Sequence, residues 1–223
     1  MISHGEIVLS GTSEDRTLAN LVDGIDFIAG GHSHVLTPDP ILVGAGVFTQ
    51  SVSFAGKALV TVKGGYTNNG GTWDWDPTNQ VTVIYGNGSS PIVMPAGAVS
   101  NTLSCLSLRG SGTGGNKAGI ELTGPASNLL VEGCTIVSNQ YGVYGTSTKP
   151  QSLTLRNTVL ARNTSHAMYF YNGDNGIPSG ITGGYSYMYN CTVADNGGCG
   201  YYSQTGNFDW GEIVPIVINC MFT

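Results

Sequence analysis

The sequence predicts an all-β solenoid, a parallel β-helix of about seven to eight coils, on three observations. A six-residue pattern of apolar and turn residues recurs at intervals of 19 to 33 residues, which is the length of one solenoid coil. Short apolar runs follow the turns, and the chain contains 34 glycines. The coils show no helical periodicity, which argues against leucine-rich and ankyrin repeats because each of their units contains a helix.

The recurring pattern places an inward residue first, an apolar residue two positions later, with Ser107 the one polar exception, and a turn residue five positions after the first in seven of the eight repeats. The first positions are Ile41, Val60, Val81, Cys105, Cys134, Thr158, Cys191 and Cys220. The structural turn positions are Gly46, Gly65, Gly86, Gly110, Asn139, Asn163 and Asn196. Glycine and asparagine enter the left-handed backbone region at the lowest cost. We therefore expect positive φ angles at the turn positions and a stacked asparagine ladder.

Cysteine recurs at the first position of the pattern. The expected members of an inward, buried cysteine ladder are Cys105, Cys134, Thr158, Cys191 and Cys220. Buried cysteine behaves as a small apolar residue, which favours free thiols, although strands roughly 4.8 Å apart leave a Cys191–Cys220 disulfide open. Cys199 lies outside the ladder. Cys134→Ser is expected to cost on the order of 1–3 kcal/mol, because a hydroxyl in an apolar stack would lack a partner.

Three stretches of the chain, residues 39–49, 62–67 and 129–139, combine short apolar strands with glycine or asparagine turns. With these stretches the chain resembles the right-handed parallel β-helix proteins of the pectate-lyase-like superfamily, over about residues 39–223. The resemblance implies a right-handed β-helix for that region. It implies little about chemistry, because function depends on the site that a fold carries.

Residues 1–38 do not follow the pattern and are expected to form a short α/β capping segment, with a helix over 14–22 and a strand over 26–29. Together with residues 2–4 and 22–26, the Gly-Gly-His-Ser-His run at 30–34 resembles the 5′-nucleotidase branch of the metallophosphoesterases. The resemblance implies that His4, His32 and His34 would help bind two metal ions such as Mn²⁺ or Zn²⁺. The family's earlier motifs would lie upstream of Met1, so a fragment or a cap over the first coil is the alternative.

Charged residues make up 10% of the chain, the formal net charge is −6, and the eight lysines and arginines are scattered. This distribution provides no basic patch for nucleic acid. No apolar run is long enough to span a membrane, and residues 1–6 show no export signal. The low charge and the many Gly, Ser, Thr and Asn residues nevertheless favour an extracellular or cell-surface location.

Two kinds of excursion from the coils are candidates for carbohydrate contact. The first, within residues 67–79, alternates Trp73, Asp74, Trp75 and Asp76, which could provide aromatic stacking surfaces with polar neighbours. Alternatively, these Trp rings pack on the solenoid and the Asp side chains stabilise turns. The second kind, residues 172–184 and 203–212, is expected to bring together Asp174, Asp209 and Trp210.

The sequence favours a non-enzymatic structural or binding module without a cofactor, serving adhesion, glycan contact or self-assembly. Tyrosine-rich strands after the turns, together with the outward Thr61, Thr82, Thr135 and Thr192, predict a flat polar and aromatic face. The alternative is a polysaccharide lyase or glycoside hydrolase of the pectate-lyase-like superfamily, which would use clustered carboxylates or bound Ca²⁺. The sequence shows no such cluster and assigns no catalytic residue. A phosphoesterase fragment is the second alternative, and the last strand, residues 217–223, is expected to pair with another chain.

Overall fold

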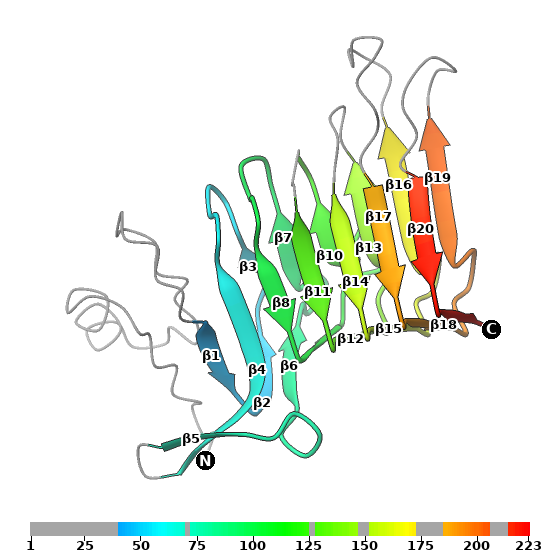
Figure 1. The fold of residues 1–223 in the computed structure, drawn as a ribbon. Helices are drawn as coiled ribbons and strands as arrows, with labels where there is room; N and C mark the ends of the chain where they lie inside the picture. The colour runs from blue at the N-terminus through cyan, green and yellow to red at the C-terminus, as the bar shows by residue number, and fades with distance from the viewer. Residues whose placement is uncertain (1–39, 70–71, 125–127, 147–151, 173–184, 206–213) are drawn as a thin grey trace.

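The computed structural model describes residues 40–69, 72–124, 128–146, 152–172, 185–205 and 214–223. Every regular element in these ranges is a β-strand, and the strands form three parallel sheets that run side by side along the molecule (Figure 1). The prediction of an all-β parallel β-helix is therefore confirmed. The predicted capping segment of residues 1–38 lies outside the described residues.

Each sheet collects one strand from every complete coil. Sheet A contains β1 (Ile41–Gly44), β4 (Thr61–Asn69), β8 (Thr102–Ser104), β11 (Leu129–Glu132), β14 (Leu153–Arg156), β17 (Tyr185–Tyr189) and β20 (Val214–Ile218). Sheet B contains β2 (Gly46–Thr49), β6 (Thr82–Tyr85), β9 (Leu106–Arg109), β12 (Thr135–Val137), β15 (Val159–Ala161), β18 (Thr192–Ala194) and β21 (Met221–Phe222). Sheet C contains β3 (Val52–Ser53), β7 (Ile92–Met94), β10 (Ala118–Leu122), β13 (Tyr141–Thr146), β16 (Met168–Asn172) and β19 (Tyr201–Thr205).

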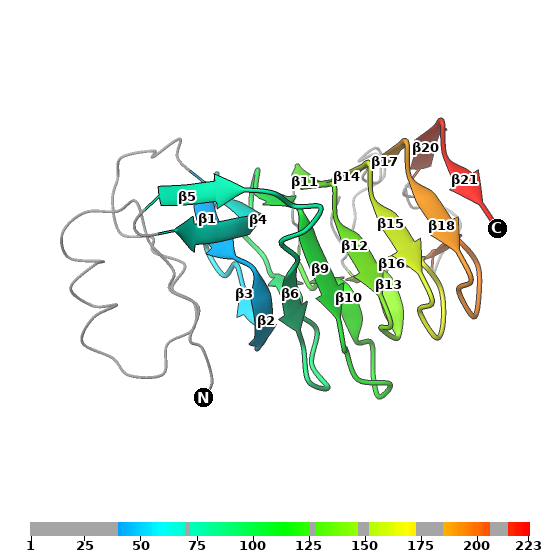
Figure 2. The ribbon, with the colours of Figure 1, turned by 90° about the horizontal axis from the view of Figure 1, so that it is seen from below.

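The described strands make six complete three-strand coils and a seventh coil that contains β20 and β21. Viewed from below, sheet B lies across the molecule from β2 to β21 (Figure 2). One element departs from this plan: β5 (Thr72–Trp75) pairs antiparallel with the end of β4 and forms a hairpin beside the first coils.

The core fills the space between the three sheets. Strands that alternate apolar and polar residues point every second side chain inward, and stacked coils continue each inward residue into a row. The inward row of sheet A contains Val62, Leu103, Val131, Leu155 and Met188, and that of sheet B contains Ile84, Leu108, Ile136, Leu160 and Val193. All ten side chains are buried, so one continuous core runs along the coils.

The predicted pattern is one residue out of register between Val81 and Gly110. Thr82 pairs with Leu106, and the pairing of Thr135 with Ser107 places Leu106 beside Cys134. Thr82 and Leu106 are therefore the buried first positions, in place of Val81 and Cys105. The Thr82 hydroxyl donates to the Gly44 carbonyl at 2.8 Å, which explains how a threonine that was expected to face outward is accommodated inside.

The first two pattern positions also belong to a different sheet. Ile41 lies in β1 and Val60 directly precedes β4, both in sheet A, whereas the later positions lie at the start of sheet B strands. Val60 and Val81 consequently mark two strands of one coil. The sequence could not distinguish them, because strands of either sheet repeat apolar residues at every second position.

The left-handed residue at the asparagine turns precedes the asparagine. Ser138, Arg162 and Asp195 have φ angles of 57°, 52° and 54°. Asn139, Asn163 and Asn196 do not have positive φ, and Gly86 does not either, so the predicted backbone angles are wrong at these four positions. The remaining three turn positions have positive φ as predicted: Gly46, Gly65 and Gly110. The asparagine follows the turn because its side chain must point inward to reach backbone carbonyls.

Candidate functional site

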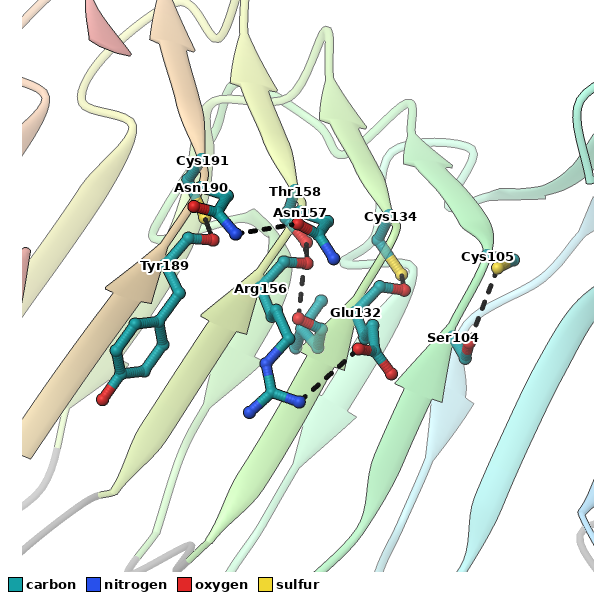
Figure 3. Close-up of polar contacts among 11 residues, drawn as sticks. Ser104, Cys105, Glu132, Cys134, Arg156, Asn157, Thr158, Tyr189, Asn190 and Cys191 are labelled. Carbon is teal, nitrogen blue, oxygen red and sulfur yellow. Dashed lines mark hydrogen bonds and ion pairs between the residues drawn. The ribbon is translucent and has the colours of Figure 1, made fainter. Parts of the chain in front are cut away.

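Cys134, Thr158 and Cys191 line the corner where sheet A passes into sheet B, which we call the A–B corner (Figure 3). Cys220 occupies the same position in the last described coil. Each of these side chains donates a hydrogen bond to the carbonyl two residues earlier, for example Thr158 Oγ1 to Arg156 at 2.9 Å and Cys134 Sγ to Glu132 at 3.4 Å. The residue just before each one has positive φ: Gly133, Asn157, Asn190 and Asn219. The ladder therefore closes a tight corner as well as filling the core.

Cys105 does not belong to this ladder, which corrects the prediction. Its φ of 54° and the hydrogen bond from its backbone N–H to Glu132 place it opposite Gly133, the left-handed position of the next coil. Its sulfur accepts a hydrogen bond from Ser104 Oγ at 3.5 Å, and the residue is half-buried. Cys220, at the edge of the last described coil, is half-buried as well. Cys134 and Cys191 are fully buried as expected.

Cys134→Ser is expected to change the free energy of unfolding by about 1 kcal/mol or less, which revises the larger cost expected above. The serine hydroxyl would replace the thiol as donor to the Glu132 carbonyl, as the Thr158 hydroxyl already does with Arg156. Cys134→Val, which has no donor, provides the comparison. Urea unfolding of both variants measures the difference, and a loss above about 2 kcal/mol for serine alone would contradict this assignment.

The asparagine ladder lies at the second corner, between sheets B and C, which we call the B–C corner. Asn163 Nδ2 donates to the Ile136 carbonyl at 3.3 Å and to Asn196 Oδ1 at 2.9 Å, and Asn163 Oδ1 accepts from the backbone N–H of Asn139. Asn139 repeats these contacts with Leu108 and Asn163. The predicted stacking of the side chains is confirmed, and these amides serve the structure of the corner.

The candidate carbohydrate-binding residues of the β4–β5 hairpin contact other residues of the same chain. Trp73 meets Tyr66 edge-on at 6.3 Å. Trp75 donates its indole N–H to the Gly64 carbonyl at 3.2 Å, and the Lys63 ammonium lies 3.9 Å from the centre of its ring. These contacts agree with the alternative in which the Trp rings pack on the solenoid.

The two aspartates of the same excursion hold local turns. Asp74 accepts a hydrogen bond from Asn69 Nδ2 at 2.7 Å, and Asp76 accepts from the backbone and side chain of Asn79. The hydrogen bond from the Asn79 side chain is the main cause that lowers the pKa of Asp76. Outside the described residues lie the other predicted site residues: Asp174, Asp209, Trp210, His4, His32 and His34.

Sheet C carries an aromatic surface that sequence reasoning noticed only as a set of tyrosine-rich strands. We call it the tyrosine–histidine patch, and its members are Tyr141, Tyr144, His166, Tyr169 and Tyr202. Tyr144, Tyr169 and Tyr202 occupy paired positions on β13, β16 and β19. Their rings stack nearly parallel, with centroids 5.3 and 5.2 Å apart. The sequence signal is a tyrosine at the same place in three successive coils.

His166 extends the patch sideways by stacking on Tyr202 at 5.0 Å and on Tyr141 at 6.1 Å. The backbone N–H of Cys199 donates to His166 Nδ1 at 2.8 Å, so the neutral imidazole carries its proton on Nε2. Burial lowers the pKa of His166. The surface is therefore built from neutral rings at neutral pH.

The tyrosine hydroxyls supply the polar chemistry of the patch. Burial, with a smaller effect of Tyr169 and Tyr141, raises the pKa of Tyr144 to about 12, and burial also raises the pKa of Tyr169. These hydroxyls therefore stay protonated and can both donate and accept hydrogen bonds. Tyr169 already donates to Gln204 Oε1 at 3.0 Å, which shows how the patch can hold a polar group.

Other chemistry is sparse in the part of the chain that the structure describes. No three His, Cys, Asp or Glu side chains gather there in a way that could hold a metal ion. Arg156 and Glu132 form an exposed ion pair at 3.6 Å on sheet A, where solvent weakens such a pair. Among the described residues there is also no helix with the length and apolar character needed to cross a membrane.

The comparisons with known proteins give no relative. No protein-family model matches the chain, and the curated proteins and the solved structures yield no significant match. The strand order and the parallel pairing of the three sheets define the class of the molecule, a parallel β-helix protein.

Proposed function

We propose that this chain is an extracellular or cell-surface β-helix module that binds glycans through the tyrosine–histidine patch, without a cofactor. The observation that carries the proposal is the set of five contacting rings on and beside sheet C, in which Tyr202 is exposed, Tyr141, His166 and Tyr169 are partly exposed, and Tyr144 is buried. Tyrosine combines apolar ring surface with a hydroxyl, and sugars present both apolar C–H faces and hydroxyl groups. Each part of the patch therefore has a counterpart on a carbohydrate.

The arrangement of the rings suggests how a glycan would lie. The rings of the row cover one another's faces and Tyr144 is buried, so a ligand meets mainly the ring edges and hydroxyl groups of Tyr169 and Tyr202. The row follows the coil stacking, which favours an extended polymer over a single sugar. The rings hold one another in place, and a preorganised surface loses little side-chain entropy when a ligand binds.

Tyr202→Ala is expected to weaken binding to a responsive polysaccharide by about fivefold to tenfold, because the most exposed ring of the row is lost. Tyr85→Ala is the matched control, because Tyr85 on sheet B is also 37% exposed but lies outside the patch. Affinity electrophoresis against neutral and acidic polysaccharides, with thermal unfolding as a check on folding, measures the effect.

An equal change in both variants, or unchanged binding of Tyr202→Ala, would contradict glycan binding at the patch. The same panel addresses the enzymatic alternative, a pectate-lyase-like lyase or hydrolase. Unsaturated products or new reducing ends, particularly with added Ca²⁺, would replace the binding proposal with that alternative.

We also propose that the last described coil can pair with another copy of the chain. Val217 and Phe222 occupy inward positions but are 44% and 46% exposed, whereas their counterparts in the preceding coil, Met188 and Val193, are buried. The outer edges of β20 and β21 also present backbone groups that could pair with a further strand. Exposed apolar residues and a strand edge together favour association.

Sedimentation velocity over a range of protein concentrations tests this association. Wild type is expected to form a larger species, and Phe222→Lys is expected to shift it to the monomer by placing a charge at the edge. Thr192→Lys on neighbouring β18 is the control, because that side chain lies one coil away from the edge. A strict monomer at every concentration would remove the proposal.

A further inference from the structure

The thiols of Cys191 and Cys220 lie directly across from each other on neighbouring coils. Thr192 pairs with Met221, and the backbone N–H of Met221 donates to the Cys191 carbonyl at 2.9 Å, which fixes the register one residue earlier. The backbone N–H of Cys191 in turn donates to the sulfur of Cys220 at 3.3 Å. The Cys220 side chain therefore points back toward Cys191.

The other cysteines of the described chain are not placed to pair in this way. Thr158 occupies the ladder position between Cys134 and Cys191, so these two thiols are two coils apart. Cys105 contacts Ser104 at the left-handed position, one residue off the ladder. Cys199 is exposed at the B–C corner, where its backbone N–H binds His166. Among the described cysteines, the strand register therefore places Cys191 and Cys220 as the pair that can form a disulfide.

We propose that Cys191 and Cys220 form a disulfide under oxidising conditions, which fastens the last strand β21 to β18. Both thiols are free in the structure. Neighbouring strands lie about 4.8 Å apart, and the Cα atoms of a disulfide are separated by a similar distance, so bond formation needs only a small movement. This inference goes beyond glycan binding and does not depend on it.

The exposures of the two cysteines set the order of the chemistry. Cys220, the half-buried partner, attacks a low-molecular-weight disulfide such as oxidised glutathione as the thiolate, and one glutathione thiol leaves. Cys191, the buried partner, then loses its proton and attacks the Cys220 sulfur of this mixed disulfide, which releases the second glutathione thiol. Two protein thiols are oxidised and one glutathione disulfide is reduced to two thiols.

The disulfide would stabilise β21, the short strand at the edge of the last described coil. β21 contains two paired residues, Met221 and Phe222, and both side chains are exposed. A strand this short at the edge of a sheet opens readily by local unfolding. A covalent bond at Cys220 removes that opening and keeps the apolar edge of the last coil in place.

Mass spectrometry of the full chain after incubation with oxidised glutathione tests the proposal. Chymotrypsin with an Asp-directed protease separates the three nearby cysteines, because Asp195 lies between Cys191 and Cys199 and Tyr201 lies between Cys199 and Cys220. We expect a linked peptide that joins Cys191 to Cys220. We also expect slower amide exchange of residues 220–223 after oxidation, by on the order of 100-fold.

Two variants make the result decisive. Cys191→Ser is expected to stop at a stable glutathione adduct on Cys220, whereas Cys199→Ser is expected to form the linkage as wild type does. A linked peptide that contains Cys199, or three thiols that all remain titratable after oxidation of the folded protein, would overturn the proposal. So would a linkage that leaves the exchange of residues 220–223 unchanged.

Discussion

Replacing Asn163 with glycine is expected to lower the free energy of unfolding by about 3–5 kcal/mol, one of the two largest effects that the structure implies. The amide of Asn163 donates to Ile136 and Asn196 and accepts from Asn139, all within a buried corner. Removing it leaves these polar partners unsatisfied away from water, and each loss costs about 1–3 kcal/mol. Urea unfolding followed by circular dichroism measures the change.

Arg162→Gly is the matched control at the adjacent position. Arg162 is exposed and has a φ of 52°, so glycine relieves backbone strain while adding entropy to the unfolded chain. These effects oppose each other, and we expect a net change within about 1 kcal/mol. Equal losses at Arg162 and Asn163 would show that the corner depends on backbone conformation and not on the ladder.

Leu155→Ala is expected to lower the free energy of unfolding by about 3–5 kcal/mol, because the side chain is 0% exposed in the middle of the inward row of sheet A. Val217 continues the same row in the last coil, where it is 44% exposed. Val217→Ala is therefore expected to cost about 1 kcal/mol or less. Urea unfolding at low protein concentration compares the two variants.

The concentration of the protein provides a further control for this comparison. If two chains pair through the last coil, the cost of Val217→Ala should rise with concentration while that of Leu155→Ala stays constant. A cost for Val217→Ala that equals that of Leu155→Ala in the monomer would contradict the exposed edge described here.

Much of the fold could be predicted from the sequence, and the predicted strand register is most accurate from Cys134 onward. In these coils polar ladder residues mark both corners: Thr158 lies at the A–B corner, and Asn139 and Asn163 lie at the B–C corner. Between Val81 and Gly110 the sequence offers apolar residues at odd and even positions alike, as in Val81, Val83 and Ile84. Alternation alone cannot then determine which set faces inward, and the hydrogen bonds of Thr82 make the difference.

The candidate site was harder to predict, because it depends on which residues of different coils become neighbours. Tyr144, Tyr169 and Tyr202 are separated by excursions of different length, so their alignment follows from strand pairing and not from constant spacing. Trp73 and Trp75 were predicted as candidate site residues because they form a local motif in the sequence. Their contacts with Tyr66, Lys63 and Gly64 depend on the packing of the β4–β5 hairpin, which the sequence pattern does not predict.

The two corners solve the same geometric problem with different side chains. At Thr158 and at Asn196, a left-handed residue is followed by an inward polar group that donates to the carbonyl two residues earlier. Such a corner is specified by three consecutive residues and needs only a similar corner above and below it. Duplication of the stretch that encodes β11, β12 and β13 would therefore add one whole coil without redesigning its neighbours. The length of this rod is thus open to change in discrete steps during evolution or by protein engineering.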